Sequence, residues 1–119
     1  MQTALVTGAS SGIGECYTKQ LAARGYNLII VSRDGELLNK VAREITDTHG
    51  VKVSVLAKNL ATMTAAEELF EWTKSEGHTV NVLINNAGMF SFCDILKTPV
   101  ERLERIILLH DLTLTTICR

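Results

Sequence analysis

The sequence predicts an α/β fold, a doubly wound parallel sheet with helices on both faces. Three observations predict it. Short runs rich in Val, Ile and Leu alternate with stretches of helical spacing. The runs are apolar on both faces, as buried parallel strands are. A glycine-rich stretch, Val6–Gly14, begins at the end of the first run. The expected order of elements is therefore β-α-β-α-β-α-β-α, with strand order 3-2-1-4 in the sheet.

The first two βα units have clear boundaries. The first helix is expected over 12–24, with Gly25 as its stop. Asp34 is a good N-cap for the second helix. The apolar faces of the two helices consist of Ile13, Tyr17 and Leu21, and of Leu37, Leu38, Val41 and Ile45. The four predicted strands are 4–7, 28–31, 51–56 and 80–84.

The last two helices begin with cap signals. Thr64 and Glu67 form a capping-box pattern, and Leu69, Phe70 and Thr73 mark the buried side that follows. The fourth helix, over 99–119, has Thr98 at the N-cap and Pro99 at the first turn. Its expected buried stripe is Val100, Leu103, Ile107, His110, Leu114 and Ile117, and Ile106, Leu108, Leu109 and Leu112 add apolar surface elsewhere.

Size and charge narrow the functional classes. The 119 residues predict one domain, 1–119, and the net charge of −1 does not favour nucleic acid. No apolar run is long enough to span a bilayer, and no secretory signal is indicated. Three distant cysteines match no metal spacing and favour the cytoplasm.

The glycine-rich stretch is typical of a phosphate-binding loop. A helix N-terminus offers unpaired N–H groups and partial positive charge, so it binds phosphate without a lysine. Gly8 would allow the sharp turn out of the strand, Gly12 the approach of the backbone to a diphosphate, and Gly14 close packing of the helix. Ser10 and Ser11 add hydroxyl donors.

Two motifs resemble the short-chain dehydrogenase/reductase family. "TGASSGIG" is similar to its cofactor signature, and "NNAG", Asn85 to Gly88, follows the fourth strand as it does in that family. The resemblance implies a Rossmann-like fold, truncated here after the fourth βα unit, and a nicotinamide dinucleotide across the carboxyl ends of the strands. Ile13 belongs to the implied cofactor loop.

The end of the second strand favours NADP(H) over NAD(H). Enzymes that prefer NAD place a carboxylate at this point, where this chain has Ser32 and Arg33. An arginine pairs with the 2′-phosphate through charge-assisted hydrogen bonds. The alternative is that Arg33 is a solvated loop charge.

The resemblance assigns further residues to the cofactor. Asn59 replaces the Asp of an Asp-Leu pair that contacts adenine, with Leu60 beside it. Asn86, Ala87 and Gly88 are assigned to the ribose and phosphate side, and Asn85 to holding neighbouring strands together.

The family's catalytic groups are not found in this chain. A Tyr-x-x-x-Lys pair and a preceding serine carry the proton chemistry in the family, but Leu21 follows Tyr17 and Ile30 follows Tyr26 at that spacing. His110 stands where the family has a relay asparagine. It either imitates that amide or fills space on the buried stripe.

Two functions remain open. The chain is either the cofactor half of an oxidoreductase that transfers hydride between nicotinamide and a carbonyl or alcohol, inactive alone, or a non-catalytic dinucleotide-binding or dimerising module. A strand edge without a partner is expected at 80–86, and the helix over 99–119 is apolar on nearly all sides. Both features predict a second copy or the missing C-terminal half as partner. The substrate is not indicated, and only Met89–Cys93 would border it.

Overall fold

A computed structural model describes residues 2–88 and 94–119 of the chain. Four parallel strands form one sheet in the order β3-β2-β1-β4, which confirms the predicted topology. The strands are β1 (Thr3–Thr7), β2 (Asn27–Ser32), β3 (Val53–Ala57) and β4 (Val82–Ile84). The prediction that residues 89–93 border the substrate concerns a segment outside the described residues.

The sheet register brings the carboxyl ends of all four strands together. Val6 pairs with Ile30 on one side and with Ile84 on the other, so β1 lies at the centre of the loop-bearing edge. Among the described strands, β4 pairs only with β1. The predicted open edge is therefore present in the described part of the chain.

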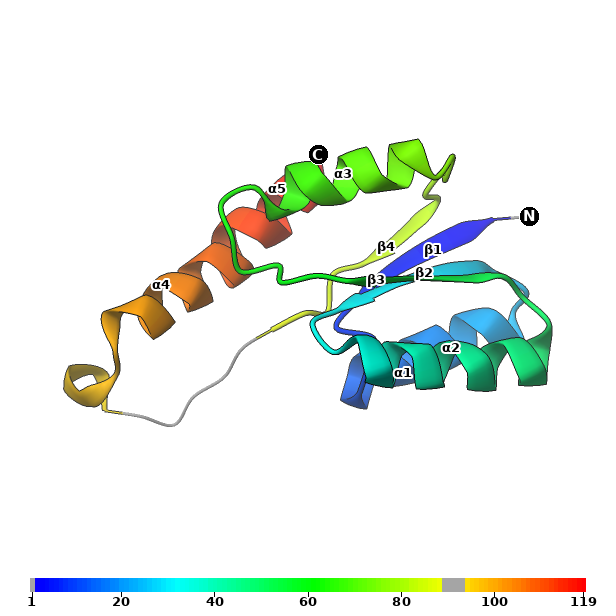
Figure 1. The fold of residues 1–119 in the computed structure, drawn as a ribbon, viewed down its shortest axis with the longest axis horizontal. Coiled ribbons are helices and arrows are strands. Elements are labelled where there is room, and N and C mark those ends of the chain that lie inside the picture. Colours follow the sequence, from blue (N-terminus) through cyan, green and yellow to red (C-terminus); the bar gives the residue numbers. More distant parts are fainter. Residues whose placement is uncertain (1, 89–93) are drawn as a thin grey trace.

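Helices cover both faces of the sheet. Figure 1 shows α1 and α2 below the sheet and α3 and α5 above it. The helical elements are α1 (Gly12–Ala23), α2 (Gly35–His49), α3 (Ala65–Ser75), η1 (Ile95–Lys97), α4 (Val100–Ile107), the π-helical η2 (Leu108–Thr113) and α5 (Leu114–Ile117).

Each face of the sheet has its own buried core, because β-strand side chains alternate between faces. Val6, Leu28 and Ile30 pack with Leu38 and Ile45 on the side of α1 and α2. The opposite cluster contains Leu5, Ile29, Val31, Leu60, Ala61, Ala65, Leu69 and Leu109. The second cluster joins α3 and η2 to the strand ends that carry the site.

The buried face of α1 differs from the predicted one. Ile13 and Tyr17 are 69% and 46% exposed, whereas the buried residues are Gly14, Thr18 and Ala22. These small residues, four positions apart, let the helix approach the sheet closely. The prediction failed because it followed hydrophobicity, whereas the short distance between helix and sheet selects side-chain size.

One of the three predicted caps is confirmed. The Asp34 carboxylate accepts from the Leu37 amide at 3.1 Å, and Leu38, Val41 and Ile45 are buried as expected, whereas Leu37 is exposed. The Thr64–Glu67 capping box is wrong, since the Thr64 hydroxyl donates to Glu68 and the Thr64 backbone is not extended.

Two further details of the last helices are corrected. Pro99 is the N-cap of α4, and the Thr98 hydroxyl donates to the Asp94 carbonyl at 2.9 Å instead. On α3, Leu69 and Thr73 are buried as predicted, but Phe70 is exposed.

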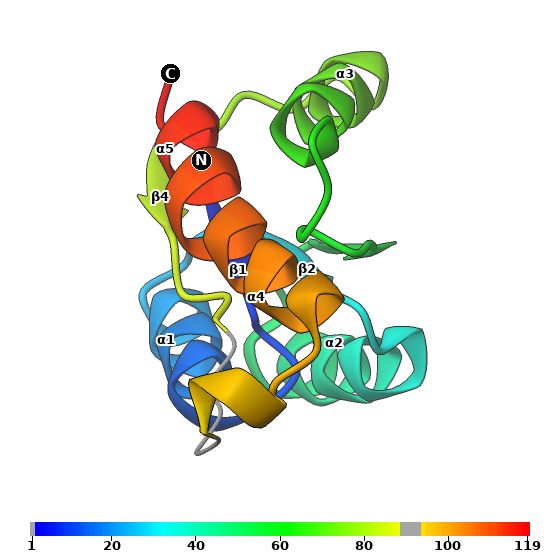
Figure 2. The same cartoon turned by 90° about the vertical axis from the view of Figure 1, so that its left-hand side faces the viewer.

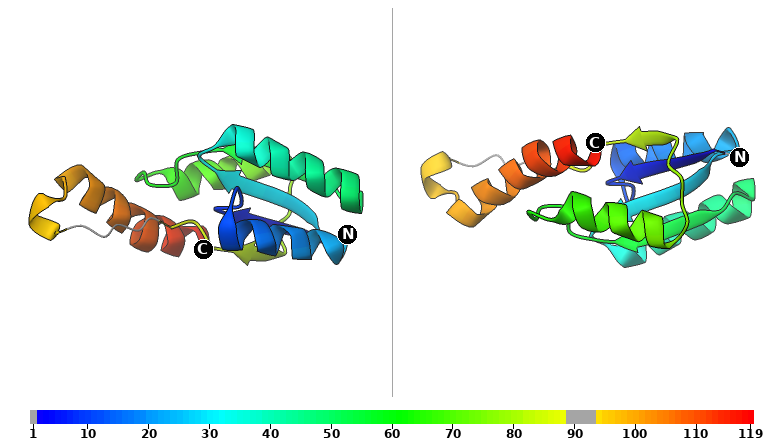
Figure 3. Two further views of the ribbon diagram at one scale, coloured as in Figure 1. Left: turned by 90° about the horizontal axis from the view of Figure 1, so that it is seen from below. Right: turned by 90° about the horizontal axis from the view of Figure 1, so that it is seen from above.

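The fourth helical segment is not one regular α-helix. The turns of η2 are π-helical, so the face that packs on the protein changes along the segment. Leu109 and Thr113 are buried, whereas Val100, Ile107 and His110 of the predicted stripe are exposed. Figures 2 and 3 show why: α4 and η1 extend beyond the sheet, and only η2 and α5 lie against it.

Candidate cofactor site

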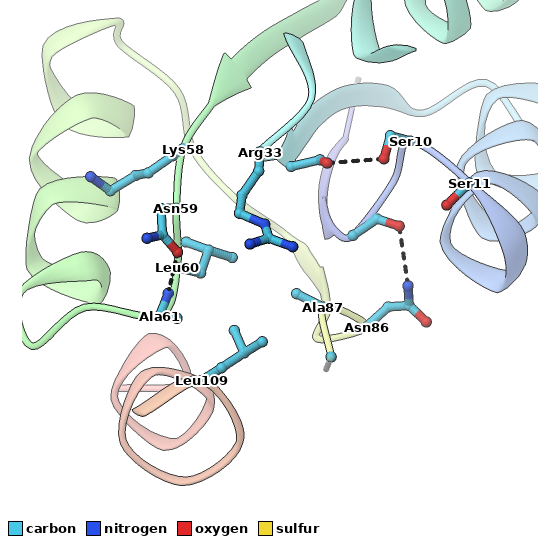
Figure 4. A pocket seen from close by; sticks show the side chains of 13 residues that line it. Ser10, Ser11, Arg33, Lys58, Asn59, Leu60, Ala61, Asn86, Ala87 and Leu109 are labelled. Carbon is cyan, nitrogen blue, oxygen red and sulfur yellow. Dashed lines mark hydrogen bonds between the residues drawn. The ribbon is translucent and has the colours of Figure 1, made fainter. Parts of the chain in front are cut away.

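A pocket of about 310 Å³ lies where the strand ends, α1 and η2 meet. Figure 4 shows it from close by. Its described lining contains ten of the thirteen cofactor residues predicted from sequence, and adds Lys58, Ala61 and Leu109. The lining residues are Gly8, Ser10, Ser11, Ser32, Arg33, Lys58, Asn59, Leu60, Ala61, Asn86, Ala87, Gly88 and Leu109. The loop members Gly12, Ile13 and Gly14 follow directly at the start of α1.

The backbone of the glycine-rich loop requires glycine at two points for different reasons. Gly8 has a φ of 66°, and its amide donates to the Val31 carbonyl at 2.8 Å, so the chain turns sharply over the end of β2. At Gly14, a Cβ would lie 2.1 Å from the Gly8 carbonyl oxygen. The predicted roles of these two glycines in turn and packing agree with this geometry.

The N-terminus of α1 is open toward a ligand. Its N-cap, Ser11, is extended at a φ of −161° and forms no side-chain cap bond with the described residues. A Cβ at Gly12 would have no heavy atom within 4 Å, so the backbone there faces open space. First-turn amides without a capping side chain are suited to an anion.

Thr7 is a residue that the sequence analysis missed. Its hydroxyl accepts from the Asn86 and Ala87 amides, each at 3.0 Å, and donates to the Ile84 carbonyl at 3.5 Å. The Asn86 side chain adds a bond to the Gly8 carbonyl at 3.3 Å. The two loops with motif residues are thus joined through one buried threonine. The threonine that precedes Gly8 in "TGASSGIG" was the available signal.

Asn85 ties the end of β4 to the helix rather than to neighbouring strands. Its Nδ2 donates to the Leu114 carbonyl at 3.1 Å and lies 3.2 Å from the Cys118 sulfur. Within residues 2–88 and 94–119, the contact of the Asn85 side chain is therefore from strand to helix, and the strand-holding role implied by the family resemblance stays a prediction.

The side of the pocket next to β2 is polar. The Ser10 and Ser32 hydroxyls are 2.9 Å apart and hydrogen-bonded. Figure 4 shows the Arg33 side chain extending into the pocket between Asn59 and Ala87. The Asn59 side-chain oxygen, Oδ1, accepts from the Ala61 backbone amide at 3.0 Å, which forms a tight turn after β3.

The described lining carries two cations and no carboxylate. These are Arg33 and Lys58. Lys58 is ion-paired with Glu68 of α3, and its ammonium points away from the centre of the pocket (Figure 4). The hydrogen bond from Lys58, followed by that from Thr64, lowers the pKa of the Glu68 carboxyl below its ordinary value of 4.5. The pocket wall is therefore suited to an anionic ligand rather than a cation.

His110 is next to the "NNAG" loop. A Cβ at Gly88 would lie 3.1 Å from His110 Cε1, so the ring packs close to the loop's last residue. The residue is exposed, and the interpretation of His110 as a space-filling member of a buried stripe is wrong.

The described residues form neither a metal site nor a membrane-spanning helix. In the ranges 2–88 and 94–119, no group of three or more His, Cys, Asp or Glu residues is arranged to hold a metal ion. Over the same ranges, no helix has the length and apolar character that crossing a bilayer requires.

Comparisons with known proteins place this geometry in a family. Residues 2–113 match the family described as short chain dehydrogenase. A very-long-chain 3-oxoacyl-CoA reductase from Pyrenophora tritici-repentis is 38% identical over 111 residues, which are 90% of this chain and 33% of that protein. A human protein named inactive hydroxysteroid dehydrogenase-like protein 1 is 36% identical over 89 residues, 73% of this chain and 26% of the relative.

Solved structures agree with the sequence relatives. A short-chain dehydrogenase from Sphingobium yanoikuyae in complex with NADPH has a TM-score of 0.89 and 36% identity, covering 99% of this chain and 46% of its own. The chain spans about a quarter to a third of the curated relatives named above and just under half of this structure. The motifs, the strand order and these matches together show that the chain belongs to the short-chain dehydrogenase family.

Proposed function

We propose that this chain binds NADP(H) and is the cofactor-binding half of an oxidoreductase. The reaction of the whole enzyme is hydride transfer between the nicotinamide and a carbonyl or alcohol carbon, and the bound dinucleotide supplies or accepts that hydride. The observation that carries the proposal is the open N-terminus of α1 at a pocket with no described carboxylate.

The diphosphate is assigned to the loop between β1 and α1. The amides of Gly12, Ile13 and Gly14 are at the first turn of the helix, where unpaired N–H groups and partial positive charge favour an anion. The Ser10 and Ser11 hydroxyls, both on the pocket lining, add donors to the same group.

The adenosine half is assigned to the ends of β2 and β3. Arg33 extends into the pocket and pairs with the 2′-phosphate, which is the reason for a preference for NADP(H) over NAD(H). Asn59, Leu60 and Leu109 form the wall against which the base packs.

The nicotinamide half is assigned to the loop after β4. The Thr7 hydroxyl holds the amides of Asn86 and Ala87, so the backbone that leads to Gly88 is fixed beside the sugar. His110, next to Gly88, offers a donor and an acceptor in its neutral form and replaces the family's relay asparagine.

This chain alone is expected to bind dinucleotide without catalysing turnover. Its sequence has no Tyr-x-x-x-Lys pair to position a proton at the carbonyl. We assign the missing groups to a C-terminal half, which the partial coverage of the relatives supports.

A partner surface is proposed on η1 and on α4, the extended end of the fourth helix. Leu96, Val100 and Ile107 are 92%, 62% and 59% exposed. Three exposed apolar side chains on a segment that extends beyond the sheet favour burial of that segment against a second copy or the C-terminal half. The alternative function, a non-catalytic dinucleotide-binding or dimerising module, is favoured by the relative named inactive.

Titration of the purified chain with NADPH and NADH, followed by nicotinamide fluorescence, tests the proposal. The wild-type chain is expected to bind NADPH more tightly than NADH. Arg33→Glu should weaken NADPH binding at least about tenfold and leave NADH binding within about twofold, since only NADPH carries the 2′-phosphate. Arg43→Glu, the same charge change on the exposed surface of α2, is the matched control. Equal affinity for both dinucleotides would refute the preference, and no affinity for either would refute the function.

A further inference from the structure

Thr113 of η2 is one of the few polar residues that are fully buried in the described chain. It is 1% exposed, and its hydroxyl donates to the Leu60 carbonyl at 2.6 Å. The same hydroxyl lies 3.5 Å from the Thr62 carbonyl. These contacts join positions more than fifty residues apart in the chain, but Thr113 itself does not line the pocket.

The loop that receives this bond forms one wall of the pocket. Lys58, Asn59, Leu60 and Ala61 all line it, and they lie between β3 and α3 without regular secondary structure. The start of the loop is held by the Lys58 amide, which donates to the Ser32 carbonyl at 2.8 Å. The bond from Thr113 holds the far part of the loop, where the backbone has no strand partner.

One face of η2 reaches both the loop and the pocket. Leu109 lines the pocket, and Thr113, four residues later, contacts the loop. Residues four apart lie on the same face of a helix, and both of these residues are buried.

We infer that Thr113 is a positioning residue for the adenine side of the cofactor pocket. By holding the Leu60 carbonyl, its hydroxyl fixes Leu60 and Ala61 next to Leu109, and Figure 4 shows these three side chains along one side of the pocket. The inference rests on the proposed function, because the wall is assigned to the adenine that NADPH and NADH share.

The expected effect follows from the population of the wall conformation. Without the hydroxyl, the Leu60 carbonyl is left unpaired where it is buried, so the loop leaves this conformation more often. The apparent affinity is proportional to the fraction of chains that keep the wall in place. A variant in which about one chain in ten keeps the wall therefore loses affinity tenfold.

Three variants of the full 119-residue chain test the role. Thr113→Val removes the hydroxyl and keeps the shape, Thr113→Ser keeps the hydroxyl, and Thr115→Val makes the same change at an exposed position of α5. We expect Thr113→Val to weaken the binding of NADPH and of NADH by the same factor of about ten. The serine variant and the Thr115 control should stay within about twofold of wild type. Arg33→Glu, in contrast, changes the ratio of the two affinities.

A second measurement separates failure of this inference from failure of the proposed function. Amide hydrogen exchange of Ala61 in the nucleotide-free chain should be faster in Thr113→Val and unchanged in Thr113→Ser; Thr113→Ala is the substitute if the valine variant unfolds. Wild-type affinity in Thr113→Val, or equal losses in Val and Ser, would overturn the positioning role. If the wild-type chain binds neither dinucleotide, the proposed function fails, and unchanged Ala61 exchange in Thr113→Val overturns the role of Thr113 as well.

Discussion

Substitution of Gly14 by alanine tests the close contact of α1 with the loop that follows β1. Helix propensity alone predicts a gain of about 1 kcal/mol, because Gly14 lies in the first turn of α1. The structure predicts the opposite sign. The new Cβ would lie 2.1 Å from the Gly8 carbonyl oxygen, whereas side-chain Cβ atoms essentially never approach a heavy atom below 3.0 Å. The helix or the loop must therefore move by at least 0.9 Å, the difference between these two distances.

The cost of this movement is large because backbone atoms are on both sides of the contact. Overpacking costs typically about 1–3 kcal/mol, and a carbonyl cannot escape by changing rotamer. With about 3 kcal/mol for the overlap and about 1 kcal/mol gained in propensity, Gly14→Ala should lose about 2 kcal/mol of unfolding free energy. The melting temperature should fall by about 8 °C in a domain of this size.

Thermal unfolding by circular dichroism and NADPH titration measure the two consequences. The displaced helix carries the amides assigned to the diphosphate, so the NADPH affinity should fall along with the stability. Gly50→Ala is the control. Gly50 has a φ of 67°, no heavy atom lies within 4 Å of the added Cβ, and the residue is the C-cap of α2. It should cost about 1 kcal/mol through backbone strain and leave NADPH affinity unchanged. A Gly14→Ala chain as stable as wild type, with unchanged affinity, would show that the loop has room for a side chain at this position.

Three further results are expected. Thr7→Val should destabilise the chain by about 2 kcal/mol in urea unfolding, because two amides lose their acceptor; an unchanged unfolding midpoint would contradict this. The depressed pKa of Glu68 means that its pairing with Lys58 stabilises the fold above the ordinary value of 4.5 and is lost as the pH falls through the lower folded-state value. Glu68→Gln should therefore slightly reduce the fall of the melting temperature at acid pH, and added salt should do the same in the wild type. If the melting temperatures of variant and wild type depend on pH identically at low salt, the Lys58–Glu68 pair does not contribute to stability. Light scattering at micromolar concentration should show association that Val100→Glu and Ile107→Glu reduce, and a monodisperse wild-type monomer would disprove the partner surface.

The sequence was most informative where a single local rule determines the structure. Alternation of apolar runs and helical spacing predicted the strand order, and Asp34 was identified as an N-cap from its position alone. Gly8 and Gly14 were assigned the correct structural roles because the tight turn and the close packing exclude side chains.

Long-range contacts explain most of what the sequence did not reveal. Thr7 and Thr113 look like ordinary polar residues in the sequence, and their importance comes from carbonyls and amides more than fifty positions away. The predicted stripe of the fourth helix failed because it assumed one α-helical period, whereas η2 is π-helical and α4 extends past the sheet. His110 lies next to the last residue of the "NNAG" loop, a contact that helical periodicity did not indicate, and its relay role stays a prediction.

The proposed function depends on binding of a dinucleotide's diphosphate by the open turn before α1. Crystals of the chain grown or soaked with NADPH show this binding or its absence. We expect density for the diphosphate at the amides of Gly12, Ile13 and Gly14, with the 2′-phosphate at Arg33. Saturating NADPH that leaves this turn empty, or that binds elsewhere on the chain, would rule out the proposed role of the turn.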